Sequence, residues 1–356
     1  MMGMKTAVII GAGPAGITAA HTLLKRSNDY EVLVLEESQE IGGISKTVRY
    51  HGHRMDIGGH RFFSKDADVT AWWNEMMPLQ GAPSYDDILL QRQKKLAADG
   101  PDPEREDRVM LLRERVSRIY YGQQFYDYPI SLPMRTLTTM GFLTVLKAGF
   151  SYLRAALLKR KERSLEDFYI NRFGRVLYGM FFEGYTEKLW GRHPSEISAD
   201  WGAQRVKGLS IMAVIKDVFR RIAGTSNAAE ETSLIEEFVY PKFGPGQLWE
   251  TAAAEVEAMG GTIRKGAGVV GVQTDGRDRV TAVEIETADG GRETIAGDVF
   301  FSSMPLKDLV GGFDAAPDAI RAIAGGLPYR DFVTVGLLVP RLLLKNQTDK
   351  KTLGGL

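Results

Sequence analysis

A glycine-rich turn near the start of the chain carries the clearest signal of chemistry. The segment GAGPAG, residues 11–16, matches the pattern G-x-G-x-x-G between an apolar strand and a helix, and Glu36 ends the following strand. Gly11 permits the tight turn, Gly13 removes a side chain that would block a pyrophosphate, and Gly16 lets helix and strand approach. The amide groups at the helix start attract phosphates, and Glu36 can accept hydrogen bonds from a ribose. The sequence therefore predicts a dinucleotide site, although glycines alone often mark ordinary turns.

Two further glycine-rich stretches favour FAD over NAD as the dinucleotide. They are Gly42-Gly43 and Gly58-Gly59-His60. A flavin extends from the pyrophosphate over neighbouring backbone, so it needs small residues close by. An NAD dehydrogenase stays an alternative on the evidence of the first strand, helix and strand alone, and NAD(P)H is a candidate reductant. The predicted cofactor-binding residues are Gly11, Gly13, Pro14, Ala15, Gly16, Glu36, Glu37, Gly42, Gly43, Ser45, Gly58, Gly59, His60 and Val269.

The elements expected to position these loops alternate between strands and helices. Apolar runs predict strands at 4–10, 31–36, 262–273, 280–286, 298–302 and 332–339, and helices at 15–26 and 247–259. This pattern predicts an α/β fold, with a Rossmann-type FAD-binding domain and an inserted substrate domain of mixed helices and antiparallel sheet. The expected boundaries are 1–64 and 242–304 for the FAD-binding domain, and 65–241 and 305–356 for the substrate domain.

The composition narrows the range of partners. The 356 residues include 45 Lys+Arg, 45 Asp+Glu and no cysteine. A balanced charge gives no electrostatic surface for nucleic acid, so a small-molecule substrate is expected. Without cysteine there is no disulfide, thiolate nucleophile or cysteinyl–flavin link, so any flavin is non-covalent. No metal site is predicted, and the start of the chain lacks an export signal, which indicates a cytoplasmic protein.

A helical apolar pattern occurs between residues 142 and 157. Phe142, Leu146, Phe150, Leu153 and Leu157 recur on one face, and charged residues interrupt the run before it is long enough to span a membrane. A helix packed on its own core is the favoured interpretation, and a membrane-surface or substrate-channel helix is the alternative. A similar pattern follows at Ile211, Ile215, Val218 and Ile222.

The motifs together resemble a known group, the FAD-binding amine-oxidase and protoporphyrinogen-oxidase-like superfamily. GAGPAG, Glu36, the double glycine at 42–43 and the D-x-G-G-H stretch at 56–60 follow its FAD-contacting pattern in order. Within that group, FEGYTEKLWGR at 182–192 is similar to the Y-T-x-K-Q-W-G segment of UDP-galactopyranose mutases, and residues 125–133 and 244–248 also resemble mutase segments. These families continue with a C-terminal segment that covers the flavin, so the chain is expected to be truncated relative to them.

The resemblance implies roles for residues that match its motifs. Tyr185 and Trp190 would line the substrate site, with the tyrosine stacking on a uracil, and Arg205 would grip the diphosphate. His60 would lie beside the flavin, and His60 and Arg205 are the implied catalytic residues. Leu189 stands where the mutases have glutamine. Considered without the resemblance, the rings of Tyr185 and Trp190 offer flat faces for a base or sugar. The alternative interpretation is that both are aromatic residues buried in the core.

Three functions follow from these readings. The resemblance implies a flavoenzyme that acts on a nucleotide-activated sugar through a reduced flavin, with no net redox change. An FAD-dependent oxidoreductase of the amine-oxidase, protoporphyrinogen-oxidase or desaturase type, which takes hydride from its substrate, is the first alternative. A flavin-binding module without turnover is the second.

Arg113, Arg115 and Arg118 alternate with apolar residues, which favours a solvated sheet face over a phosphate site.

Overall fold

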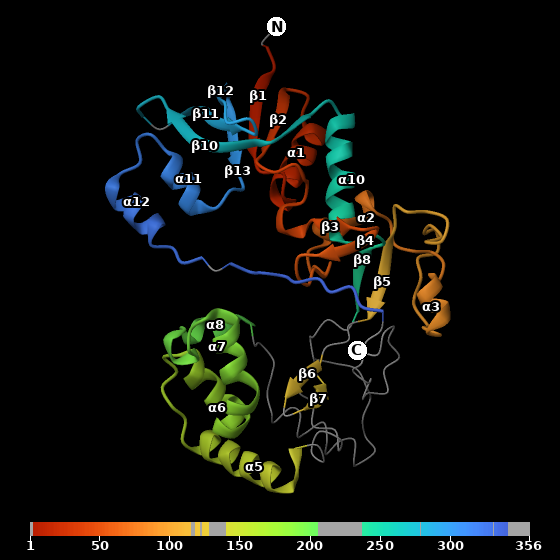
Figure 1. Ribbon diagram of the computed structural model, residues 1–356, viewed down its shortest axis with the longest axis vertical. Helices are drawn as coiled ribbons and strands as arrows, with labels where there is room; N and C mark the ends of the chain where they lie inside the picture. The colour runs from red at the N-terminus through yellow and green to blue at the C-terminus, as the bar shows by residue number, and fades with distance from the viewer. Residues whose placement is uncertain are drawn as a thin grey trace. The chain divides into compact units, whose positions relative to one another are not determined.

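A parallel sheet organises the first of two compact units. The computed structural model describes residues 3–114, 118–121, 123–127, 140–205, 237–277, 279–329 and 331–340. Among these, residues 3–114 and 237–340 form the first unit and residues 118–205 form the second, and each is described by itself (Figure 1). The sheet has the strand order β13-β1-β2-β9, with all neighbours parallel. Its strands are β1 (Lys5–Ile10), β2 (Tyr30–Glu36), β9 (Thr262–Lys265) and β13 (Val299–Ser302).

Alternate side chains of β1 point to opposite faces of the parallel sheet, and a separate layer of the structure covers each face. Ala7 and Ile9 pack with α1 (Pro14–Arg26) and α10 (Pro245–Ala258), which lie side by side in Figure 1. Val8 and Ile10 point to the opposite face, where they pack against a three-stranded antiparallel sheet. Because β1 is buried on both faces, it reads as a continuous apolar run. The second sheet consists of β10 (Ala267–Thr274), β11 (Val280–Thr287) and β12 (Arg292–Ala296).

Residues 43–114 complete the first unit around α10. Trp72 of α2 stacks on Trp249 of α10 with ring centroids 5.9 Å apart, and Trp73 meets Phe62 edge-on at 5.1 Å. These aromatic contacts join α2 to the core beneath the parallel sheet. The other elements of this unit are η1 (Gly43–Ser45), β3 (Thr47–Tyr50), β4 (His53–Asp56), α2 (Ala67–Met76), α3 (Tyr85–Leu89), β5 (Met110–Glu114), β8 (Glu237–Pro241), α11 (Leu306–Gly312) and α12 (Asp318–Gly325).

The second unit is built mainly from helices. Ser164 caps α6 by accepting a hydrogen bond from the Asp167 amide, 3.2 Å long, and the Asp167 side chain completes the capping box. Gly174 adopts a positive φ of 75° inside α6, where an added Cβ would lie 2.8 Å from the backbone of Ser151 in α5. Only glycine allows this close crossing. The elements are β6 (Arg118–Tyr121), β7 (Gln124–Asp127), α5 (Phe142–Leu157), α6 (Leu165–Tyr178), η2 (Gly179–Glu183), α7 (Gly184–Trp190), η3 (Pro194–Glu196) and α8 (Ala199–Arg205).

The predicted α/β class is confirmed, and several expected elements are corrected. The strand expected at 262–273 is two strands, because Gly266 turns the chain with a φ of 66°. Residues 332–339 form no strand, and β12 was not predicted. The division into a cofactor domain and a substrate domain stays a prediction.

The apolar face of α5 contradicts the favoured interpretation of its pattern. Its large apolar residues are exposed, whereas Ala148 and Ala155 are buried on the opposite side. The similar pattern between 211 and 222 lies outside the described residues. Of the helices that the structure describes, none has the length and apolar character needed to cross a membrane.

Candidate dinucleotide site

The glycine turn joins β1 to α1, and two of its glycines stand where there is no room for a side chain. Gly11 has a φ of 98°, and an added Cβ would lie 2.4 Å from the Ser303 hydroxyl at the end of β13. At Gly16 an added Cβ would lie 1.8 Å from the carbonyl oxygen of Gly11. These two glycines therefore serve the close packing of strand, turn and helix, as the spacing predicts.

Gly13 differs from its neighbours because it faces the second glycine loop. Its added Cβ would contact only the Cα of Gly43, 3.9 Å away. The amide of Gly42 donates a 3.0 Å hydrogen bond to the carbonyl of Ala12, so the two loops lie against each other. Gly42 and Gly43 have φ values of 104° and 54°, a conformation that favours glycine. The structure thus brings together two of the three glycine stretches selected from the sequence.

The carboxylate of Glu36 is held in place at the end of β2. One oxygen accepts a 2.7 Å hydrogen bond from the amide of Ala12, and the other accepts bonds from the Ser38 amide at 3.0 Å and its hydroxyl at 2.8 Å. A carboxylate offers about four acceptor positions, so capacity remains for a ribose hydroxyl. Glu37 lies beside Gly268, whose added Cβ would be 3.2 Å from the Glu37 Cγ, and Val269 follows in β10. The predicted contacts at 36 and 37 thus lie at and just after the end of β2, and the one at 269 lies in β10, which contacts β2.

The third glycine stretch follows β4. Gly58 has a φ of 104°, and Gly59 has open space on the side of an added Cβ. The Nε2 atom of His60 is buried and has no hydrogen-bond partner among the described residues. A buried ring nitrogen without a partner is costly unless another polar group satisfies it. This site therefore fits a bound polar ligand beside His60, as expected for a flavin.

A polar network that the sequence analysis did not select fastens β3 and β4 to the start of α10. Thr47 donates a 2.8 Å hydrogen bond to Asp56 and accepts one of 3.0 Å from the Gly246 amide. The Tyr240 hydroxyl also donates to Asp56, and burial together with this carboxylate raises the pKa of Tyr240. Gly244 and Gly246 would place added Cβ atoms 2.3 and 2.5 Å from Thr47 atoms. The two glycines of GPGQL, residues 244–248, were the sequence signal for this network, because they mark the close packing of the start of α10 against Thr47.

The charged residues near the second loop form surface ion pairs. Lys46 pairs with Glu40, and Arg49 pairs with Glu250 at 2.8 Å. The amide of Ser45 donates a 2.9 Å hydrogen bond to the Gly42 carbonyl within η1. Ser45 is therefore close to the predicted pyrophosphate position, while the two cations have carboxylate partners of their own.

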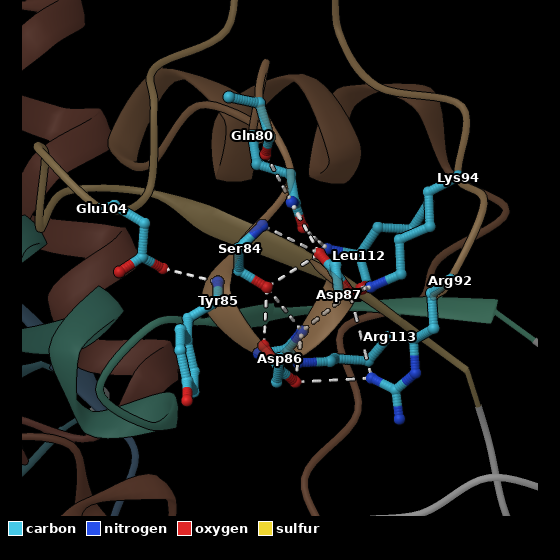
Figure 2. Close-up of polar contacts among 11 residues, drawn as sticks. Gln80, Ser84, Tyr85, Asp86, Asp87, Arg92, Lys94, Glu104, Leu112 and Arg113 are labelled. Atoms are coloured by element: carbon cyan, nitrogen blue, oxygen red, sulfur yellow. Dashed lines mark hydrogen bonds and ion pairs between the residues drawn. The ribbon is translucent and has the colours of Figure 1, made fainter. Parts of the chain in front are cut away.

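Arg113 belongs to a half-buried ion network and not to a solvated face. Its guanidinium lies 3.2 Å from Asp86 and 3.6 Å from Asp87, and Lys94 pairs with Asp87 from the other side (Figure 2). Burial raises the pKa of Asp87, but bonds from Lys94, Ser84 and neighbouring groups outweigh it and lower that pKa to about 2. Arg113 is thus occupied in the fold. Arg115 and the side chain of Arg118 lie outside the described residues.

The second unit presents the other predicted site residues on α7. Tyr185 is 67% exposed and Trp190 is 41% exposed, so neither is a core aromatic. Trp190 meets Trp201 edge-on, with centroids 4.9 Å apart, and Leu189 is also exposed. The preceding turn, η2, is a π-helix, a feature frequent at functional sites. Arg205 ends α8, and its side chain lies outside the described part.

Among the described residues, no group of three or more His, Asp or Glu side chains could hold a metal ion. The candidate sites among the described residues are the paired glycine loops with Glu36 and the exposed aromatics of α7.

Comparison with known proteins agrees with this geometry. A family model described as an NAD(P)-binding Rossmann-like domain matches residues 9–76, which contain all three glycine stretches. A probable UDP-galactopyranose mutase from Klebsiella pneumoniae is 26% identical over 212 residues, which cover 56% of this chain. A crystal structure of reduced UDP-galactopyranose mutase superposes over 92% of the chain with a TM-score of 0.62 and 18% identity. The chain therefore shares its fold with this mutase structure.

A second curated relative is an oxidase, and it matches a short part of the chain. Polyamine oxidase 1 from Oryza sativa subsp. japonica is 40% identical over 52 residues, 14% of this chain and 10% of that protein. The chain spans 44% of the length of the Klebsiella mutase and 62% of the mutase crystal structure. The comparisons therefore agree with the resemblance inferred from the sequence, and the fold that it implies is confirmed.

Proposed function

We propose that this chain binds FAD non-covalently in its first unit and acts on a nucleotide-activated sugar through the reduced flavin. The observation that carries the proposal is the contact between the two glycine loops, where the Gly42 amide bonds to Ala12 and Gly13 faces Gly43. This arrangement leaves small residues on both sides of the predicted pyrophosphate path, next to the start of α1. Glu36 supplies an oriented acceptor for the ribose.

The second unit is proposed as the substrate domain. Exposed Tyr185 offers its ring to a nucleotide base, and Trp190 offers an adjoining apolar face to the sugar. Arg205 is proposed to bind the diphosphate by bidentate hydrogen bonds. A bound reduced flavin supplies the nucleophilic centre that such a reaction needs. The role proposed for Tyr185, Trp190 and Arg205 is to bind and orient the nucleotide sugar.

The test begins with the purified full chain and its visible flavin absorbance. The protein is then reduced with dithionite under anaerobic conditions and incubated with UDP-galactopyranose, and the sugar nucleotides are separated by chromatography. Conversion to an isomer by the reduced protein only, and slower conversion at low substrate concentration by Tyr185→Ala at unchanged flavin content, would support the proposal. Bound flavin with unchanged UDP-galactopyranose would reject the mutase reaction.

A second candidate is an FAD-dependent oxidoreductase, which the similarity to a polyamine oxidase favours. In this function the substrate transfers hydride to the flavin, so anaerobic addition of a polyamine or a porphyrinogen should bleach the visible absorbance. Bleaching by NADH or NADPH alone would identify a reductant. Stoichiometric flavin with none of these responses would indicate a flavin-binding module without turnover.

A further inference from the structure

An exposed apolar stripe runs along α5 in the second unit. Its five large residues are between 54% and 82% exposed, although the helix buries Ala148 and Ala155 on its other side against α6. The stripe consists of Phe142, Leu146, Phe150, Leu153 and Leu157. Scattered apolar residues are normal on a protein surface, but a contiguous stripe of leucine and phenylalanine marks an interaction site.

The charges next to the α5 stripe have one sign. Residues 141–161 contain no Asp or Glu and five basic residues. At about 100° per residue, Lys147 and Arg154 project along the same edge of the stripe, and both are exposed without an ion-pair partner among the described residues. Lys159 and Lys161 follow the helix and are also exposed.

We propose that the α5 stripe binds the surface of an anionic lipid bilayer. A helix with an exposed apolar face and flanking Lys or Arg lies in the plane of the interface, with its leucines and phenylalanines below the headgroups. The cations at its edge then meet lipid phosphates, which attract each basic residue. Because Lys147 and Arg154 break the apolar run, the helix suits a position on the membrane and not across it.

Charge argues against a second copy of the chain as the occupant of the α5 stripe. An antiparallel pair of α5 helices crossing at Phe150 would place Lys147 of one copy beside Arg154 of the other. A parallel pair would place the two basic edges on opposite flanks of the contact, where residues 141–161 of the other copy offer no Asp or Glu to pair with them. Like charges next to a desolvated apolar contact weaken association. An anionic surface satisfies the apolar stripe and its basic edge together.

The experiment uses the full chain and sucrose-gradient flotation with two kinds of vesicle. Vesicles of phosphatidylcholine with phosphatidylglycerol should carry the protein upward, and vesicles of phosphatidylcholine alone should carry much less. High salt should reduce the binding to the anionic vesicles, because it screens the basic edge. Flotation reads out membrane binding without flavin or substrate, so its result is separate from the test of the proposed function.

Matched variants identify the surface responsible. Leu146→Gln with Phe150→Gln should lower the partition onto anionic vesicles by roughly 100-fold, at about tenfold for each exposed apolar residue lost. Lys147→Gln with Arg154→Gln should lower it by roughly 25-fold and remove most of the salt dependence. Ile88→Gln with Leu89→Gln removes two exposed apolar residues of α3 and should change nothing.

Several results would overturn the proposal. They are an absence of flotation with anionic vesicles, equal flotation of the α5 and α3 variants, and a preference for neutral vesicles. A concentration-dependent dimer that is lost in the Leu146→Gln and Phe150→Gln variant, without vesicle binding, would assign the stripe to a second copy and also reject a membrane partner.

Discussion

The space between Gly13 and Gly43 permits a sharp test of the cofactor site. In Gly13→Ala the new methyl group would contact only the Gly43 Cα, at an ordinary distance of 3.9 Å. Gly13 also has a φ of −75°, which any residue adopts without strain. The variant should therefore fold like the wild-type protein, while its methyl group occupies the predicted approach of the pyrophosphate.

The expected loss concerns FAD affinity and not stability. If the methyl group displaces the pyrophosphate from two charge-assisted hydrogen bonds, each of about 1.5–3 kcal/mol, binding weakens by about 3–6 kcal/mol. That corresponds to roughly 10²- to 10⁴-fold in Kd. Isothermal titration of the flavin-free protein with FAD measures this change, and thermal unfolding of the same samples reports on the fold.

Two further glycine variants are controls for the Gly13→Ala experiment. Gly16→Ala places its methyl group 1.8 Å from the Gly11 carbonyl oxygen, so it should lower the unfolding temperature of the flavin-free protein. Gly311→Ala lies in α11 with nothing within 4 Å of the added atom, so it should leave FAD affinity unchanged and should not lower the unfolding temperature. If Gly13→Ala binds FAD as tightly as the wild-type protein, the placement of the pyrophosphate is refuted. If Gly13→Ala has a lowered unfolding temperature, the argument that its methyl group fits beside Gly43 is refuted.

The remaining predictions concern the substrate residues and the buried network. Tyr185→Ala should raise the KM for the nucleotide sugar about tenfold by removing one stacking face, with flavin content unchanged in absorbance spectra. Arg205→Ala should raise KM in steady-state assays and leave flavin bound, and flavin loss in step with activity would contradict its role at the diphosphate. Asp87 has a folded pKa of about 2 against 3.8 when unfolded, so its carboxylate stabilises the fold above pH 4 and loses this contribution as the pH falls toward 2. Urea unfolding should show the stability difference between wild type and Asp87→Asn shrinking by about 2 kcal/mol over that range.

The parts of the fold with strict local requirements were predictable from the sequence. Strand β1, helix α1 and strand β2 begin and end within two residues of the expected bounds, because an apolar run, a glycine turn and a proline at the helix start leave few alternatives. The glycine pattern also predicts the pairing of strand, turn and helix, since Gly11 and Gly16 are needed for steric reasons. Gly266 was the readable signal for the break between β9 and β10.

Long-range contacts were not predictable in the same way. Nothing local in LLRERVSR indicates that Arg113 meets Asp86 and Asp87, because these partners lie in helix α3, well before Arg113 in the sequence. The same holds for Thr47 and Gly246, which are joined by a hydrogen bond across 199 residues. Residues 332–339 have the composition of a strand, yet a strand forms only where a neighbour supplies backbone partners.

The two amphipathic helices α1 and α5 show that the spacing of apolar residues does not determine what the apolar face of a helix packs against. In α1 the apolar face lies against the parallel sheet, where Ile17 and Ala20 are completely buried. In α5 a face with the same period is exposed, and the helix packs through small residues, Ala148 and Ala155, on its opposite side. Periodicity therefore identifies a face that gains free energy by leaving water, but it does not identify the partner. The charges beside the face supply that information, and in α5 they are all positive, which favours an anionic surface over a protein core.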